Sequence, residues 1–144
     1  MRKAFSLITA IIILVFMATL LVLMLSLSTQ SAKQTGDIYL KEQAELLARS
    51  ATEYALLAIS GHKTDTTNGC VEKIDLRYPA NAPSFDINVS IYYIGKNLPC
   101  TSSKILDNNI STSDSNATVI IDTFVTNLQS DEPIRYHRRT IQKP

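Results

Sequence analysis

The sequence has few of the residues on which catalytic and metal-binding motifs depend. Tryptophan is absent, and 144 residues include only four glycines, two cysteines and two histidines. No G-x-S-x-G, H-E-x-x-H or glycine-rich phosphate loop occurs, so we expect no enzyme activity, no catalytic residue and no cofactor. Since His62 and His137 show no H-x-x-x-H spacing and the cysteines no C-x-x-C spacing, we expect no metal site either.

An excess of charge of one sign is also missing. Fourteen basic and thirteen acidic residues give a net charge of +1, which provides no overall attraction to nucleic acid or to a membrane surface. Basic residues gather only near the C-terminus, at Arg135, Arg138, Arg139 and Lys143. This cluster has two interpretations: contacts to DNA phosphates, or an edge strand whose charges prevent aggregation, which we favour.

What the sequence does have is one long apolar run near its beginning. Residues 5–27 contain no charge, and two basic residues, Arg2 and Lys3, precede them. A helix over this range would be roughly 35 Å long, enough to cross a hydrocarbon core of about 30 Å. The basic start predicts a cytoplasmic N-terminus and an exported remainder. A cleaved signal peptide is the alternative, although its apolar stretch is usually shorter than this one.

The first residues, MRKAFSLI, followed by the apolar run, resemble the start of type IV pilins and type II secretion pseudopilins. In that family a peptidase removes a short basic leader, and the new N-terminal residue, usually Phe, is methylated. The resemblance implies cleavage between Ala4 and Phe5 and methylation of Phe5. Two positions depart from the pattern: Ala4 replaces the usual Gly, and Thr9 replaces the usual Glu. The family's Glu pairs with a neighbouring subunit's terminal amine, so Thr9 favours a minor subunit.

The segment after the apolar run has the pattern of an amphipathic helix. Apolar or small residues recur at steps of three and four and predict one buried face: Leu40, Ala44, Leu47, Ala51, Tyr54 and Ala58. Gly61 follows as a natural C-cap. Either one helix runs over residues 5–60, or a second helix begins at Asp37 after a break at Gly36. The pilin resemblance implies the first arrangement.

The remaining residues, 61–144, predict a small β-rich head. Alternation over residues 85–93 and β-branched residues over 117–127 indicate two strands. Residues 134–142 suit a third strand at an edge because of their charges, and residues 74–78 a short fourth. An antiparallel sheet packed on the helix face gives an α+β fold. The expected organisation is a leader at 1–4, a membrane or filament-core helix at 5–27, its amphipathic continuation at 28–60, and the head.

Cys70 and Cys100 both lie on the side of the apolar run that would be exported. In an oxidising compartment such a pair favours a disulfide. A closed loop of about 30 residues would stabilise the head by roughly 3–4 kcal/mol on the chain-entropy model. A head of this size gains from such a bond.

Three N-x-S/T sequons occur in the same region, at Asn88, Asn109 and Asn116. An aspartate stands two residues before each asparagine, in the strings DINVS, DNNIS and DSNAT. This resembles the extended acceptor sequon of N-glycosylation in Campylobacter-like bacteria. The alternative interpretation is that these are polar loops with turn-forming residues.

Together these features predict a minor pilin or pseudopilin of a type II secretion, type IV pilus or DNA-uptake machine. The resemblance implies other pilin-like subunits, the prepilin peptidase, an inner-membrane assembly platform and the lipid bilayer as partners. The expected location is the bacterial inner membrane, with one span and a periplasmic head. The alternative is a single-pass anchored periplasmic protein that does not polymerise.

Overall fold

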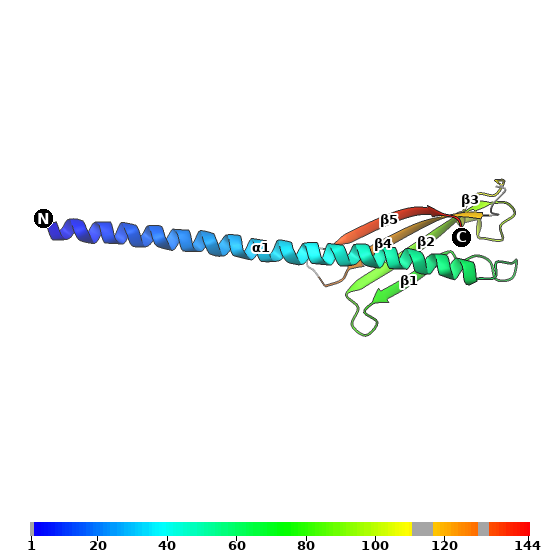
Figure 1. The fold of residues 1–144 in the computed structure, drawn as a ribbon, viewed down its shortest axis with the longest axis horizontal. Coiled ribbons are helices and arrows are strands. Elements are labelled where there is room, and N and C mark those ends of the chain that lie inside the picture. Colours follow the sequence, from blue (N-terminus) through cyan, green and yellow to red (C-terminus); the bar gives the residue numbers. More distant parts are fainter. Residues whose placement is uncertain (1, 111–116, 130–132) are drawn as a thin grey trace. The chain divides into compact units, whose positions relative to one another are not determined.

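A computed structural model describes residues 2–110, 117–129 and 133–144, with side chains from Leu7 onward. The described residues form one long helix, a short 3-10 turn and one sheet (Figure 1). The elements in chain order are α1 (Arg2–Gly61), β1 (Lys73–Tyr78), β2 (Phe85–Gly95), η1 (Ser102–Lys104), β3 (Ile105–Asp107), β4 (Ala117–Asn127) and β5 (Arg135–Gln142). The predicted α+β fold is confirmed.

The helix α1 has no interruption at Gly36 or Asp37, which confirms one helix rather than two. Gly36 has no atoms near the position of a side chain, so no packing requirement selects glycine there. A glycine inside a helix costs about 1 kcal/mol. Propagation of the long helix on both sides of Gly36 offsets that cost. The chain divides into two units, residues 1–39 and residues 40–144.

The sheet has the order β1-β2-β4-β5, with antiparallel pairing along this path. The four strands predicted from the sequence are confirmed, and β5 lies at an edge as expected. The strand β3 was not predicted, because the surrounding residues were interpreted as a polar loop. It pairs with β2 in parallel and has only three residues. A strand of this length is too short for an alternating pattern to be visible in the sequence.

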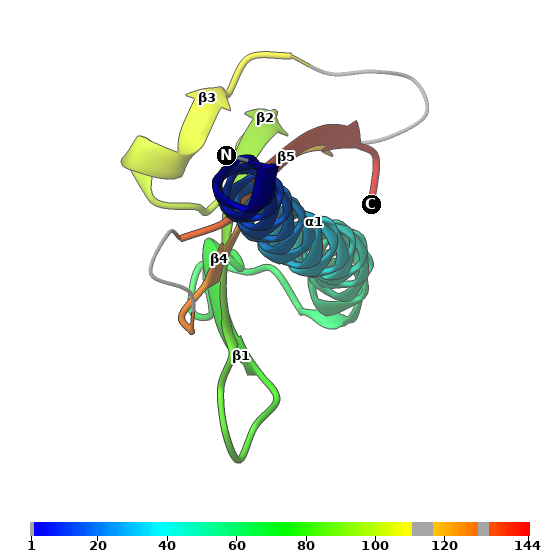
Figure 2. The same cartoon turned by 90° about the vertical axis from the view of Figure 1, so that its left-hand side faces the viewer.

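The core of the head lies between the sheet and residues 40–61 of α1 (Figures 1 and 2). Every second residue of β2 is buried, so the strand turns one side to the helix. The residues buried from the helix are small: Ala44, Ala48, Ala51, Thr52 and Ala55. Small side chains permit close approach of the helix to the β-branched residues of β2 and β4.

The predicted buried face of this helix was partly wrong. Ala44 and Ala51 are buried as expected, but Tyr54 is 52% exposed. Ala48 and Ala55, which the prediction omitted, are fully buried. The true face is therefore rotated toward the smallest side chains. The large Tyr54 ring lies at the border of the interface, where its hydroxyl can remain in water.

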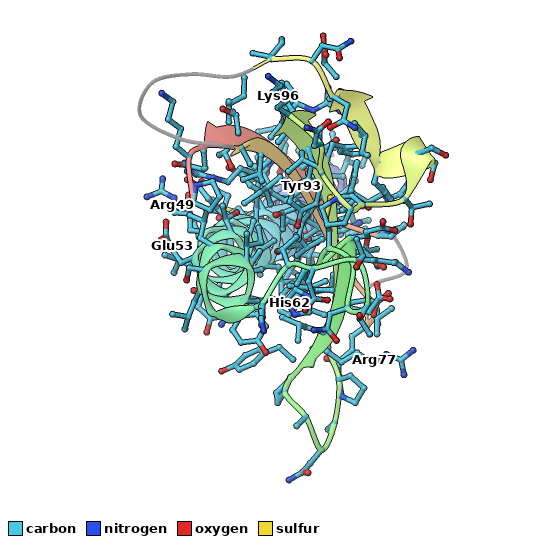
Figure 3. All side chains as sticks on the ribbon, turned by 90° about the vertical axis from the view of Figure 1, so that its right-hand side faces the viewer. Arg49, Glu53, His62, Arg77, Tyr93 and Lys96 are labelled. Atoms are coloured by element: carbon cyan, nitrogen blue, oxygen red, sulfur yellow. A yellow bond between two sulfur atoms is a disulfide. The ribbon has the colours of Figure 1, made fainter. Side chains whose placement is uncertain are left out.

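Figure 3 shows the resulting arrangement of polar groups around the head. Arg49 and Glu53 lie on the side of α1 away from the sheet, and Arg77 points away from the helix on the other side of the sheet. Tyr93 lies between, with its hydroxyl donating to the Val71 carbonyl at 2.7 Å. Burial, and then the charge of Glu72, raise the pKa of Tyr93 to about 12, although the hydrogen bond to Val71 opposes this. Tyr93 is therefore neutral at physiological pH.

Candidate functional site

The apolar side chains of the first unit point outward from α1. Leu14 is 71% exposed and Phe16 61%, and the remaining large apolar residues between Leu7 and Leu27 are exposed as well. This part of α1 is long and apolar enough to cross a membrane. Residues exposed to this degree cannot form a core within the described chain, so lipid or another protein has to cover them.

The polar residues inside this apolar stretch are compatible with such an environment. The hydroxyl of Thr19 donates to the Phe16 carbonyl at 2.8 Å. Near the end of the stretch, the Thr29 hydroxyl donates to the Ser26 carbonyl at the same distance. Each of these hydroxyls donates a hydrogen bond to a carbonyl of its own helix. Neither would therefore face lipid without a hydrogen-bond partner.

The residues at the predicted leader junction lie in the first turns of α1. Arg2, Lys3, Ala4 and Phe5 are helical, and their side chains lie outside the described set. Thr9, where the resembling family has Glu, is exposed on the helix. Cleavage and methylation at Ala4 and Phe5 therefore remain predictions.

The basic residues near the C-terminus do not form one surface. Arg135 and Arg139 point to the face of the sheet opposite α1, whereas Arg138 lies on the other face. Lys143 follows the end of β5. Successive side chains of a strand point to opposite faces of the sheet. Basic residues that are neighbours in the sequence therefore need not form one basic surface. Contact of these residues with DNA stays a prediction.

Arg139 is also neutralised by an acid, Asp122, which was not among the predicted site residues. Its Nε and Nη2 donate to the two carboxylate oxygens of Asp122, at 2.6 and 2.5 Å. Asp122 is only 3% exposed, and the Nε2 atom of His137 lies 3.1 Å from its Oδ1. The Arg139 guanidinium, followed by His137, lowers the pKa of Asp122 against the opposing effect of burial. An acid in the middle of the β-branched strand at 117–127 was the available signal for such a pair.

The same face of the sheet carries aromatic contacts. The Phe124 ring stacks on the His137 ring, with centroids 4.3 Å apart and an interplanar angle of 9°. The Lys104 ammonium lies over the Tyr92 ring, 4.5 Å from its centroid. The first contact joins β5 to β4, and the second joins η1 to β2. They stabilise the sheet edge and contain no nucleophile paired with a base.

The predicted disulfide between Cys70 and Cys100 is present, with Cα atoms 5.0 Å apart. It joins the loop after α1 to the loop after β2. Glu72 strengthens the same junction, because its Oε1 accepts the backbone amide of Thr101 at 2.7 Å. The disulfide thus holds these two loops together at the end of the sheet near Tyr93.

The sequons lie in different environments. Asn88 is half-buried in β2, and its Nδ2 donates to Asp86 Oδ2 at 3.2 Å. Asn109 is exposed after β3. Asn116 lies outside the described residues.

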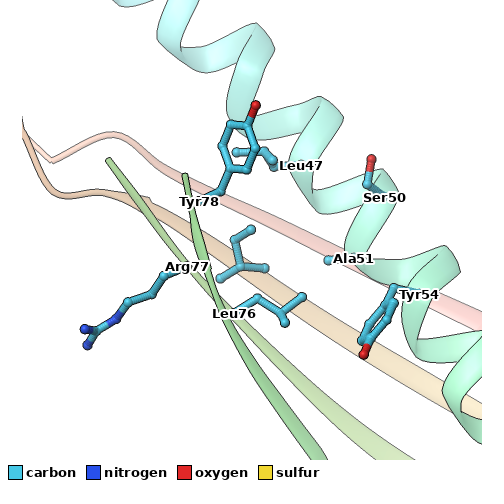
Figure 4. A pocket seen from close by; sticks show the side chains of 8 residues that line it. Leu47, Ser50, Ala51, Tyr54, Leu76, Arg77 and Tyr78 are labelled. Atoms are coloured by element: carbon cyan, nitrogen blue, oxygen red, sulfur yellow. The ribbon is translucent and has the colours of Figure 1, made fainter. Parts of the chain in front are cut away.

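One apolar groove of about 380 Å³ lies within the head, between α1 and β1 (Figure 4). Leu47, Tyr54, Leu76 and Tyr78 line it, while the Arg77 side chain points away. It holds no cluster of titratable groups. Among the described residues, no three His, Cys, Asp or Glu side chains gather in a way that could hold a metal ion.

Comparisons with known proteins give no assignment. No protein-family model, no curated protein and no solved structure matches this chain. The geometry therefore carries the functional argument: an outward-facing apolar segment of α1, and a disulfide-bonded head.

Proposed function

We propose that the protein is a minor pilin or pseudopilin, a structural subunit of a type II secretion, type IV pilus or DNA-uptake assembly. The observation that carries this proposal is the helix α1. It is continuous from the basic N-terminal residues, through the exposed apolar residues, to the residues that pack on the sheet. Among these the buried alanines, named the alanine stripe, are Ala44, Ala48, Ala51 and Ala55. The resemblance of residues 1–8 to a prepilin junction supports the same function.

The physical reasoning concerns what can cover the apolar half of α1. In lipid, the exposed residues between Leu7 and Leu27 are favourably placed, with all backbone groups bonded within the helix. Outside lipid, they need a protein cover of similar helices, since exposed apolar surface of this extent drives association. A filament core of parallel helices provides that cover. The proposed activity is therefore assembly, with the head displayed on the exported side.

A non-polymerising, single-pass anchored protein is the second candidate, and Thr9 leaves it open. The family's Glu at this position makes a subunit contact through its charge, and a threonine cannot replace that contact. In the second candidate, residues 7–27 remain in lipid permanently. The two candidates differ in the neighbours of these residues, and a cross-linking experiment can identify them.

For this experiment, a photoreactive amino acid replaces Leu21 in the full-length chain in its native cells. Leu21 is 62% exposed and lies within the apolar half. Assembly predicts cross-links to a second copy or to other pilin-like subunits. A second variant adds Ala4→Leu, which places a large residue before the cut and blocks leader removal. Assembly predicts that the protein cross-links disappear in this variant. Adducts with lipid alone, unchanged by Ala4→Leu, would contradict the proposal and support the anchor.

A further inference from the structure

The three sequons share a sequence pattern, and the structure distinguishes two of them. Asn109 is the second residue after the end of β3, and Asn88 lies within β2. Asn116 is outside the described residues. An oligosaccharide can be attached to a folded protein only where the asparagine carboxamide is accessible and the surroundings leave room for a bulky group.

Asn109 meets the first requirement. The residue is exposed, while its backbone is held in place. The backbone N–H of Asn109 donates to Asp107 Oδ1 at 2.8 Å, and Asn109 pairs with Lys96 in an isolated β-bridge. The next amide, of Ile110, donates to the Gly95 carbonyl at 3.1 Å. The acceptor therefore stands on an ordered backbone that the aspartate of its own sequon helps to shape.

The neighbouring asparagine provides an internal contrast. Asn108 is half-buried, and its Oδ1 accepts the backbone N–H of Leu98 at 2.9 Å. Its carboxamide is thus used to hold two loops together. Asn108 is also not followed by Ser or Thr two residues later, so it has no sequon. The side chain of Asn108 therefore has a structural role, whereas Asn109 is exposed to solvent.

Asn88 fails the second requirement. It lies in β2 between β1 and β4, opposite Asp75 on one side and Phe124 on the other. Side chains directly opposite each other in a sheet have Cβ atoms about 4.5–5.5 Å apart. Its Nδ2 also donates to Asp86. A sugar would replace one of the two hydrogens on Nδ2 and would have to displace the flanking side chains.

We propose that Asn109 is the acceptor of an N-linked oligosaccharide and that Asn88 stays unmodified in the folded head. The donor class is an oligosaccharide carried on a lipid diphosphate. The Asn109 amide nitrogen forms a bond to the anomeric carbon, the sugar–phosphate C–O bond breaks, and the lipid diphosphate leaves with the electron pair. The nitrogen loses one proton, and nothing is oxidised or reduced. The inference rests on the proposed function in one respect, because that function places the head on the exported side.

The test is peptide mass analysis of the full-length protein purified from its native membranes. Trypsin cleaves after Arg77, Lys96, Lys104 and Arg135, so Asn88 falls on the peptide 78–96 and Asn109 on the peptide 105–135. We expect sugar mass on the peptide 105–135, localised to Asn109 by fragmentation, and an unmodified peptide 78–96. Asn109→Gln should remove the adduct at this position, and the matched control Asn108→Gln should retain it.

Three results would overturn the inference: an unmodified peptide 105–135, an adduct on Asn116 alone, or sugar on Asn88. The N-terminal peptide of the same sample reports on the proposed function separately. A chain that begins at methylated Phe5 but lacks sugar contradicts only the glycan inference. A chain that carries sugar at Asn109 but begins at Met1 contradicts only the assembly proposal.

Discussion

Residues 7–27 and residues 44–55 belong to the same helix, yet they differ in the size of their apolar side chains and in whether these side chains are buried. In the first segment, Leu, Ile, Val, Phe and Met side chains all face outward and are more than one-third exposed. In the second, alanines and one threonine face the sheet and are almost fully buried. Large apolar residues thus lie where the chain offers no cover, and small ones where it does.

The comparison shows that one helix can combine two kinds of apolar surface with different partners. The alanine stripe is specific: its shape matches β2 and β4, and Thr52 is bonded to Ala48 and to Thr123. The outward apolar surface has no such specific match and suits lipid or similar helices. Changes in one segment should therefore affect the head, and changes in the other should affect membrane insertion and assembly.

The largest effect on the head should come from removing its disulfide. The double variant Cys70→Ser/Cys100→Ser opens a loop with a sequence separation of 30 residues. We expect a loss of about 3–4 kcal/mol in the free energy of unfolding. Urea denaturation in detergent, followed by the near-UV signal of the tyrosines, measures this loss. Membrane insertion should not change, and an unaltered urea midpoint would show that the bond does not stabilise the head.

A charge in the outward apolar segment should give the next largest effect, and only on insertion. Val15→Arg places a charge near the middle of the apolar stretch, at a cost of about 3 kcal/mol for insertion. The matched control, Glu53→Arg, alters an exposed position in the other half and should change stability by less than about 0.5 kcal/mol. Alkaline extraction of membranes measures retention. Full retention of Val15→Arg would indicate that these residues do not lie in lipid.

The same substitution in both segments sharpens the comparison further. Ala48→Leu forces a large side chain into the closed interface with the sheet and should destabilise the head by about 1–3 kcal/mol. Ala18→Leu adds apolar surface to the outward segment, and we expect no loss of head stability. Urea midpoints of both variants measure the difference. Equal midpoints would contradict the assignment of the alanine stripe as the packed face.

The smallest effect should be the pH dependence of the Asp122 ion pair. The pKa of Asp122 is lowered in the folded state, so its contribution to stability is complete above the unfolded value and is lost as pH falls below about 4. We expect a contribution of about 1–2 kcal/mol at neutral pH. Denaturation of wild type and Asp122→Asn at pH 7 and pH 3.5 measures it. The difference between the two proteins should shrink at the lower pH, and a constant difference would exclude the carboxylate charge as the cause.

Local patterns in the sequence were sufficient to predict much of this fold. Alternation over residues 85–93 and β-branched residues over 117–127 identified the two central strands, because a half-buried strand imposes a period of two. The apolar run and the following helix formers identified α1. The compartment argument also identified the Cys70–Cys100 bond, which depends on two residues only.

Features that depend on neighbours in space were missed. The buried helix face was displaced toward Tyr54, since periodicity alone cannot show that alanine fits the sheet better than a larger residue. The Asp122–Arg139 ion pair was also missed, because its two residues lie on different strands. Both features depend on tertiary packing, which the local pattern does not show.

The most direct test of the central claim is the N-terminal sequence and intact mass of the protein purified from its native membranes. The claim is that residues 1–4 are a leader and that α1 is released for assembly at Phe5. The account predicts a chain that begins at methylated Phe5. A chain that begins at Met1 would contradict it and leave a permanent anchor. A chain that begins after Leu27 would contradict both and indicate a soluble exported head.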